Sequence, residues 1–451
     1  MAITLSTAFL SELNKGVNQP SIIIEMVLDS GIIKYGYHNA FYDVRPILKD
    51  VSSLQNKIDA KSGYATRGQL TFVITGRDNF KTLIKDNYLK NRRVNRKDGF
   101  TASGFAYSDY ATTFTGKIKD WARKEDELTI TVADDTYDVK KKIPEENITK
   151  TQYLDYRNTN PVDIMTNMLI TQAGIGSAYV DSAKFTSEKD LWLSTWIFDR
   201  VITKPLAIQD YLNELQIETN SFILHDGEKI TFKVFSPAMP VATEEWTDTN
   251  IIDNSFKMDS GYDNNFYNRI LVYYDYDESD NDKEENFESA LIAIDAASQD
   301  ITQWDEVNTK TIKSKWIRTQ RFVRNPSNIT GIVFYHAARA NGLGTGTLVY
   351  NYANQTLQYT APGGTAGTAV KLSKDGKHQI LDSDTSKYVR VLVTRASLPV
   401  SNQTDTITIS ALSGSAMAET LATKLLRRYR DPVATAAFEI DINDVSYNSQ
   451  F

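Results

Sequence analysis

The sequence predicts a multi-domain protein that is mainly β with some α. Its 451 residues are enough for two to four domains with sizeable cores. Aromatic residues make up 11% of the chain, which suits a β-rich protein. Short runs in which apolar and polar residues alternate recur along the chain and end at Gly, Asp or Asn. Hydrophobic residues at 41% and charged residues at 24% are typical of globular proteins.

The composition excludes several classes of site and protein. The chain has no cysteine, which excludes a disulfide scaffold, a thiolate metal site and a cysteine nucleophile. Its net charge of -7 gives no overall attraction for nucleic acid. No apolar run approaches the ~18 residues that a membrane helix needs, and the first residues lack the basic and apolar regions of a secretory signal. We therefore expect neither a membrane span nor a leader.

The first part of the chain predicts a set of strands. Residues 21–28 and 31–37 form a hairpin, because Asp29-Ser30-Gly31 is a suitable turn between two apolar runs. A third strand is expected at 69–75, followed by a short helix capped by Asp78 or Asn79.

A second hairpin is expected from 113–121 and 127–133. Phe114, Gly116 and Ile118 alternate with polar residues in the first arm, and the second arm alternates in the same way. Such alternation indicates that one face is buried and the other is wet. Residues 122–126 are expected to form a charged connection.

The middle of the chain predicts two helices and a hairpin. The first helix has Pro161 in its first turn and ends near Gly174, and the second begins at Pro205. The strands 221–224 and 229–235 flank Asp226-Gly227, a pair that favours a type I′ turn.

The last part of the chain mixes strands and a helix. A strand at 268–276 precedes an acidic stretch, and a helix is expected at 416–429 with Ser415 as its cap. A final strand is expected at 434–442. Between them the composition shifts towards Gly, Thr, Ala and Ser, which indicates an inserted β-sandwich. Its six short strands are expected at 331–336, 347–351, 356–360, 368–372, 387–394 and 405–410.

Two motifs resemble ligand sites but fit them poorly. An EF-hand loop that starts at Asp275 needs Gly at its sixth position and Glu at its twelfth, where the chain has Asp280 and Asn286. We therefore expect a solvated loop over 277–285. The glycines of 342–346 lead into a strand rather than a helix, so they indicate a turn and not a phosphate loop.

A basic run is interpreted as a solvated helix and loop, with docking of an acidic neighbour or of nucleic acid as the alternatives. Its members are Lys81, Lys85, Lys90, Arg92, Arg93, Arg96 and Lys97. The sequence marks no catalytic, cofactor or metal-binding set, so no enzyme and no cofactor are expected.

Three stretches carry a resemblance to a known family. They are Phe114-Thr-Gly116-Lys-Ile118, the run from Leu128 through Ile130 to Asp134, and Asn268-Arg-Ile270-Leu-Val272-Tyr-Tyr274. In their order along the chain they resemble the baseplate hub proteins, or tail hub proteins, of long-tailed bacteriophages. The resemblance covers most of the chain apart from 321–412.

This resemblance implies two tube-like β-barrel domains, 1–150 and 251–320 plus 413–451, on either side of a mixed α/β section at 151–250. The inserted sandwich, expected at 321–412 from its composition and strands, is a departure from the family. It implies a homotrimer whose six β domains continue the pseudo-sixfold tail tube. The expected partners are the tail tube, a distal tail protein, and tip, fibre or spike proteins, with DNA as passing cargo during genome ejection. The expected location is the tail tip of the virion, after assembly in the host cytoplasm. The family supplies no catalytic residues.

Two further functions compete with the hub. A receptor-adhesion protein is the runner-up, with the insert as a carbohydrate-binding module for a host surface glycan. Its aromatic platform is expected from Tyr335, Tyr350, Tyr352 and Tyr359, unless these rings belong to the sandwich core. A glycan-degrading enzyme, which needs two carboxylates in a cleft, is the third.

A subunit contact is expected at the end of the last predicted helix. Its candidates are Arg427, Arg428 and Arg430. The alternative is that these cations only complement the dipole at the C-terminal end of the helix.

Overall fold

The structure is a computed structural model, and the chain is mainly β within the residues it describes. The described residues are 5–15, 17–41, 43–54, 68–145, 154–202, 205–235, 251–259, 266–276, 286–300, 306–318, 320–325, 332–336, 346–361, 363–372, 377–381, 383, 388–393, 404–411, 414–430 and 435–438.

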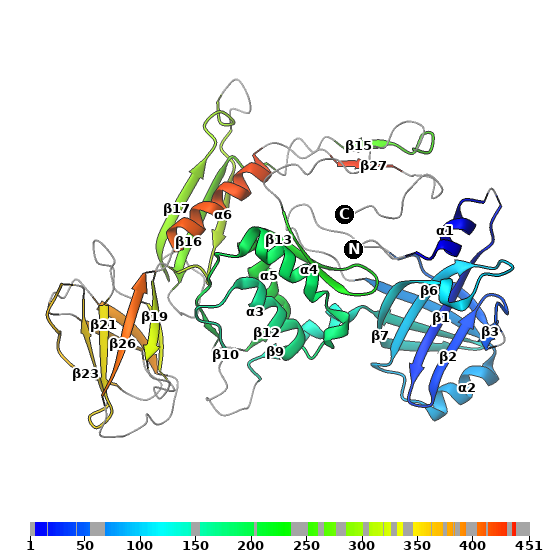
Figure 1. The fold of residues 1–451 in the computed structure, drawn as a ribbon, viewed down its shortest axis with the longest axis horizontal. Helices are drawn as coiled ribbons and strands as arrows, with labels where there is room; N and C mark the ends of the chain where they lie inside the picture. The colour runs from blue at the N-terminus through cyan, green and yellow to red at the C-terminus, as the bar shows by residue number, and fades with distance from the viewer. Residues whose placement is uncertain are drawn as a thin grey trace.

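An eight-stranded sheet dominates the N-terminal part of the molecule, on the right of Figure 1. Its strand order is β3-β2-β1-β6-β7-β8-β5-β4, and all neighbours are antiparallel except β2 and β3. The strands are β1 Pro20–Leu28, β2 Gly31–Gly36, β3 Val44–Arg45, β4 Leu48–Val51, β5 Gln69–Thr75, β6 Arg93–Phe100, β7 Ala111–Lys124 and β8 Glu127–Ala133.

The sheet is curved but open, so the prediction of a closed barrel is wrong for the described residues. The strands at its two ends are β3, with two residues, and β4, which has four and an irregular register beside β5. Such short end strands leave too few backbone groups to close the sheet with a ladder.

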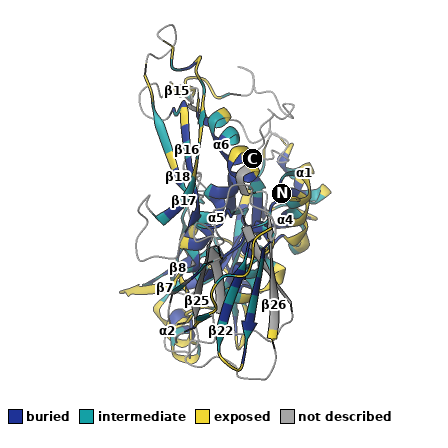
Figure 2. Ribbon diagram, turned by 90° about the vertical axis from the view of Figure 1, so that its left-hand side faces the viewer, coloured by how far each residue is buried: buried dark blue, intermediate teal, exposed yellow. Residues whose placement is uncertain are grey.

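Both faces of this sheet are covered by apolar side chains. On one face, Phe72 and Ile130 pack with Phe80 and Leu83 of helix α2, Arg77–Asp86. On the other face, helix α1, Thr7–Leu13, packs through Phe9 on the aromatic rings near the end of β6. The far end of β7 projects beyond this core and is exposed (Figure 2).

The predicted strands of this part are confirmed, whereas two local predictions are wrong. Residues 122–126 are not a connection, because β7 continues to Lys124 and turns through two residues, with Glu125 at φ 50°. The helix is not capped by Asp78 or Asn79: Gly76 precedes it, and the Asp126 carboxylate accepts from the backbone N of Arg77. Lys81 and Lys85 of the basic run lie in α2, whereas its last three members lie in strand β6, which was not predicted. Lys90 and Arg92 lie in the turn between these two elements.

The middle part contains three helices around a short hairpin. Helix α3, Pro161–Asn167, begins as predicted, and the Asn160 side chain caps it by accepting from Val162 N. It is followed by α4, Ser182–Glu188, which was not predicted, and by α5, Ile208–Thr219. The helical turn η1, Tyr107–Asp109, lies between β6 and β7 of the N-terminal sheet. The shorter elements that follow that sheet are the helical turns η2 Asp135–Lys140, η3 Met168–Gln172, η4 Ser177–Tyr179 and η5 Lys189–Leu193, and the strands β9 Lys142–Ile143, β10 Leu154–Asp155, β11 Val201–Ile202 and β12 Leu206–Ala207.

The predicted hairpin forms from β13, Ser221–His225, and β14, Ile230–Val234, but without a type I′ turn. The loop has four residues, because His225 pairs with Ile230 and Asp226 N donates to Lys229 O. The Asp226 carboxylate accepts from the backbone N of Glu228 and Lys229, which stabilises this wider loop.

A three-stranded sheet and a long helix follow. Strand β16, Arg269–Tyr276, pairs antiparallel with β17, Phe287–Ile294, and parallel with β18, Thr309–Lys313. Helix α6, Gly414–Tyr429, lies beside β16 and β17 (Figure 1) and shares the core of the middle part through Met417, Leu421 and Leu425. Together with the two-stranded ribbon of β15, Lys257–Asp259, and β27, Thr435–Ala437, these strands make no second barrel among the described residues.

Two predictions about where elements of this part begin or end are wrong or only partly confirmed. Because α6 begins at Gly414, Ser415 lies inside the helix and is not its cap. The predicted strand at 434–442 appears only as β27, and 439–442 lie outside the described residues.

The strands between Gln320 and Ala411 form two sheets at the end of the molecule opposite to the N-terminal sheet (Figure 1). One has the order β19-β26-β21-β22-β23 and the other β20-β25-β24. The strands are β19 Gln320–Asn325, β20 Ile332–His336, β21 Gly346–Asn351, β22 Thr356–Thr360, β23 Val370–Lys371, β24 Lys377–Leu381, β25 Tyr388–Val393 and β26 Thr404–Ala411. The domain boundaries given above remain a prediction.

Candidate functional site: the polar joints between the sheets

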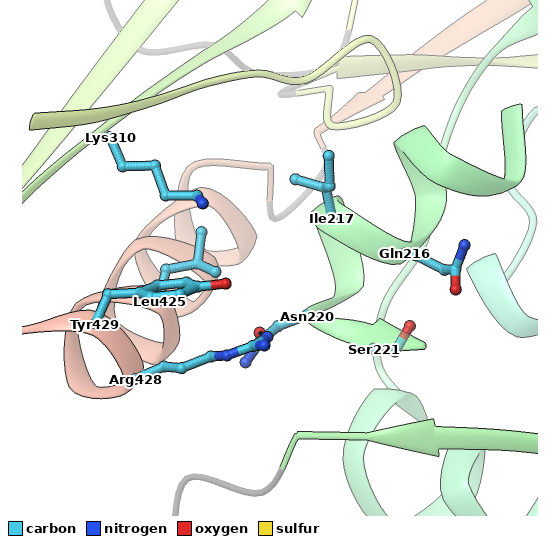
Figure 3. Close-up of a pocket in the computed structure, with 8 residues that line it drawn as sticks. All are labelled: Gln216, Ile217, Asn220, Ser221, Lys310, Leu425, Arg428 and Tyr429. Carbon is cyan, nitrogen blue, oxygen red and sulfur yellow. Dashed lines mark hydrogen bonds between the residues drawn. The ribbon is translucent and has the colours of Figure 1, made fainter. Parts of the chain in front are cut away.

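A small hollow lies where α5, β13, β18 and α6 meet, and we call this region the seam (Figure 3). Its volume is about 50 Å³, which holds a few water molecules, whereas ligand pockets usually measure about 300 Å³ or more. The seam therefore joins elements and is too small for a metabolite. It is lined by Gln216, Ile217, Asn220, Ser221, Lys310, Leu425, Arg428 and Tyr429.

Arg428 connects α6 to the end of α5. Its guanidinium stacks on Phe235 at 3.4 Å from the ring centroid, and its Nη1 donates to Asn220 Oδ1 at 3.0 Å. Asn220 ends α5 in the left-handed conformation, with φ 50°, which asparagine tolerates better than most residues. Burial lowers the pKa of Arg428, but an arginine stays charged at any physiological pH.

Lys310 closes the other side of the seam. Its Nζ lies 4.4 Å from the ring centroid of Tyr429 and 5.0 Å from that of Tyr267. These two tyrosines contact edge to face, and Tyr267 N donates to Tyr429 O at 2.6 Å. The end of α6 is thus held on both sides by cation–π contacts.

A second joint holds residues 314–318, which lead from β18 into β19 and which we call the neck. Trp316 and Ile317 are fully buried in the neck. Arg318 is 5% exposed and donates to the backbone carbonyls of Asp199 and Tyr276. The neck is therefore fixed by buried groups from several elements.

Two glutamates of α5 face the neck. Glu214 pairs with Arg200 at 2.6 Å and with Lys315 Nζ at 3.3 Å. Glu218 is 2% exposed and accepts from Ser314 Oγ and Lys315 N. Burial raises the pKa of Glu218 to about 8.

A third joint, the hairpin joint, connects the β13–β14 loop to the N-terminal sheet. Gly227 has φ +108°, and a Cβ at this position would lie 2.3 Å from Thr113 O in β7. Only glycine allows this approach. The His225 ring lies 6.2 Å from that of Phe114, and its Nδ1 accepts from Gly227 N at 3.1 Å.

A buried carboxylate anchors the hairpin joint. Asp135 is fully buried, with Arg93 Nη1 at 2.7 Å and His225 Nε2 at 3.9 Å from its Oδ2. Burial opposes its charge, but the nearby His225 ring and the Arg93 guanidinium outweigh burial and hold the pKa of Asp135 below its usual value. The Arg93 guanidinium also lies 3.6 Å from the centroid of Tyr179.

The predicted glycan platform is not exposed where the structure describes it. Tyr350, Tyr352 and Tyr359 are 0%, 2% and 4% exposed, and Tyr350 contacts Tyr352 edge to face. Rings that are this deeply buried cannot stack on a sugar, so these three belong to the core of the insert, as the alternative expected. Tyr335 lies in β20, and its side chain is not described by the structure.

The three arginines of the predicted subunit contact separate into different environments. Arg428 is engaged within the chain, as described above. Arg430 Nη1 lies 3.4 Å from Asp295 Oδ2, and its side chain is half exposed. Arg427 is exposed on the last turn of α6. These contacts within one chain do not test a subunit contact, which remains a prediction for Arg427, Arg428 and Arg430.

The remaining motifs add no site among the described residues. Asp275 is buried in β16, whereas 277–285 and 342–345 lie outside the described residues. Where the structure is described, no group of three or more His, Asp or Glu side chains is placed to hold a metal. Within the same residues, no helix is long and apolar enough to cross a membrane.

Sequence reasoning did not find the three joints. Arg93, Asp135 and His225 are far apart in the chain, and each is unremarkable alone. The one local signal was Asp226-Gly227, which predicted the hairpin but not its contact with β7. In the seam, Arg428 was singled out, although for a contact with another subunit.

No protein-family model and no curated protein matches the chain. Several solved structures are similar to it, and they include tail proteins of prophages. A prophage tail protein from Listeria monocytogenes is 8% identical, with a TM-score of 0.36, covering 90% of this chain and 99% of that one. The 43 kDa tail protein of a Shewanella oneidensis prophage is 10% identical, with a TM-score of 0.34, covering 89% of this chain and 100% of that one.

A chain in the virion of a gene transfer agent particle is 11% identical, with a TM-score of 0.26. The match covers 34% of this chain and about half, 51%, of that one. At these TM-scores the likenesses carry no argument about the fold or the function of this chain.

Proposed function

We propose that the chain is a structural component of a bacteriophage tail, a hub ring of three copies that joins the tail tube to the tip or fibres. Its partners are then other copies of the chain, the tail tube, a distal tail protein, and tip, fibre or spike proteins. The ring forms part of the DNA passage at the tail tip of the virion. The proposal assigns the chain no catalytic role.

The observation that carries the proposal is that the residues of the family resemblance lie on paired strands. Phe114, Gly116 and Ile118 lie on β7, and Leu128 and Ile130 lie on its partner β8. A Cβ at Gly116 would lie 2.4 Å from Ala133 O, so glycine is needed for the approach of the two strands. The pattern therefore has a physical role in the sheet.

The third stretch has a comparable role in the second sheet. Ile270 and Val272 of β16 are fully buried against the core that α6 shares. Asn268 is also fully buried, where its side chain donates to Glu306 O and accepts from Asn308 N. It fixes the start of β16 beside β18.

Two β units in one chain, held together by polar joints, suit a ring. Among the described residues, β17, with eight residues, is an outer strand of the three-stranded sheet, whereas the shorter β3 and β4 end the eight-stranded sheet. A long outer strand favours association with a further strand. A chain whose sheets are fixed relative to one another presents such edges in a defined geometry.

Electron microscopy of the purified chain at high concentration tests the proposal. Three copies are expected to form closed rings with a central opening and apparent sixfold symmetry. Separate particles without rings, over the whole concentration range, would contradict a ring that the chain forms by itself.

The runner-up is an adhesion protein that binds a host glycan through the insert, and the burial of Tyr350, Tyr352 and Tyr359 gives it no support. Binding of the full chain on a glycan array would revive it. We expect no glycan to bind through the tyrosines described above.

A further inference from the structure

The neck is held in place mainly by its backbone. Ser314 N donates to Tyr273 O at 2.8 Å, Asp199 N donates to Trp316 O at 3.2 Å, and Asp275 N donates to Ile317 O at 3.1 Å. These bonds come from β16 and from the segment before β11. The neck therefore lies among fixed elements, with its two apolar side chains fully buried.

The Glu218 carboxyl connects α5 to the neck. It accepts from Ser314 Oγ and, at 3.1 Å, from Lys315 N. The same Ser314 hydroxyl oxygen accepts from Ile317 N at 2.9 Å and from Trp316 N at 3.3 Å. One side chain of α5 thereby holds a turn of the neck through a single hydroxyl group.

The nearby cations engage Glu214 instead of Glu218. Glu214 lies one helical turn earlier and receives Arg200, the Lys315 ammonium and the indole N–H of Trp316. Arg318, on the neck, donates to backbone carbonyls. The donors to Glu218 are the neutral Ser314 hydroxyl and the backbone N–H of Lys315, and the Glu214 carboxylate is a like charge nearby.

This environment favours the protonated form of Glu218. Burial is the largest cause that raises its pKa to about 8, and the charge of Glu214 adds to it. The donors from Ser314 and Lys315 and the charge of Arg200 act in the opposite direction. A buried carboxyl without its own cation is expected to keep its proton at neutral pH.

We propose that Glu218 is a proton-dependent clamp on the neck: the packed neck retains the carboxyl proton, and the neck opens more readily as the pH rises. The orientation of the inserted strands would then depend on pH. This inference does not rest on the hub function, because the contacts belong to the single chain.

The direction follows from the two pKa values. In an opened neck Glu218 meets water and titrates near its ordinary 4.5, whereas in the packed neck it titrates at about 8. Between these values only the packed form holds the proton, so rising pH favours opening, by at most about tenfold per pH unit. Above about pH 8 both forms are ionised and the effect levels off.

Hydrogen–deuterium exchange of the full chain from pH 5.5 to 9 tests the clamp. After correction for the intrinsic exchange rate, the protection of peptides covering the neck should fall as the pH rises to about 8 and then level off. Glu218→Gln is expected to abolish this fall, because the amide has the same shape and does not titrate. Neck protection that is independent of pH in the unmodified chain would overturn the proposal.

A matched control is Glu188, which is also 2% exposed but lies near Lys184 and Lys233, away from the neck. Glu188→Gln should leave the pH profile of the neck unchanged. If it flattens the profile as well, the effect is global and the clamp is wrong.

A second variant, Ser314→Ala, tests the same proposal if Glu218→Gln does not fold. Ser314→Ala removes a donor that favours the charged carboxylate, so the levelling-off should move to higher pH. A profile that keeps its position after this change would count against Glu218 as the titrating group.

Discussion

Arg428 holds the end of α6 against α5 through two different contacts. Its guanidinium stacks on Phe235 and donates to Asn220, the residue that ends α5. Arg427, its neighbour, is exposed. Adjacent arginines of one helix therefore have different roles, which depend on what each side chain reaches.

Replacing Arg428 by alanine should destabilise the chain by about 1–3 kcal/mol, because a partly buried cation–π contact and a hydrogen bond are lost together. Urea unfolding of the full chain measures this change. Arg427→Ala is the control and should change the free energy of unfolding by less than about 0.5 kcal/mol.

Equal losses for the two variants would contradict this account of the seam. An Arg428→Ala variant that unfolds normally but no longer associates would instead return Arg428 to the predicted subunit contact.

At the scale of elements, the tip of the β13–β14 hairpin packs against β7. This contact depends on Gly227, whose φ is positive and whose missing side chain admits Thr113 O. Asp135 stabilises the same contact, because its carboxylate lies between Arg93 of β6 and His225 of β13. The hairpin thereby connects the N-terminal sheet to the middle part.

Gly227→Ala should destabilise the hairpin joint because the new methyl group would overlap Thr113 O. The matched control is Gly104→Ala, since Gly104 also has a positive φ, +85°, but a Cβ there meets nothing within 4 Å. Calorimetry is expected to show a loss for Gly227→Ala that exceeds the control by about 1–3 kcal/mol. Similar losses would mean that backbone strain alone accounts for Gly227.

Many of the elements were predictable, because each depends on a local pattern, but others, such as α1, β17 and β18, were not predicted. Alternation over 69–75 and 127–133 predicted β5 and β8 with their observed bounds. Strand β6 was not predicted because most of its residues are charged or polar, so apolar and polar residues do not alternate along it. The joints were not predictable, because their residues come from distant segments and none has a pattern of its own. The prediction of closed barrels was wrong because closure depends on the length of the end strands, and the sequence contains no clear signal for that length.

At the scale of the whole molecule, the inserted strands lie at one end and the N-terminal sheet at the other (Figure 1). The insert begins and ends in one place, because Gln320 of β19 pairs with Ala411 of β26. Paired residues of antiparallel strands lie about 5 Å apart, so a short linker can bridge them.

Deleting 320–411 and joining the ends with a short Gly-Ser linker should leave a folded chain that associates as the full chain does. Light scattering of both proteins measures their association states. If the shortened chain folds but loses its association, the insert takes part in assembly and is not an independent decoration.

The claim that three copies form a ring is tested most directly by the mass of the full chain in solution. Light scattering over a wide range of concentrations should converge on three times the chain mass of 50.9 kDa. A mass of one chain at every concentration would contradict a self-assembling ring.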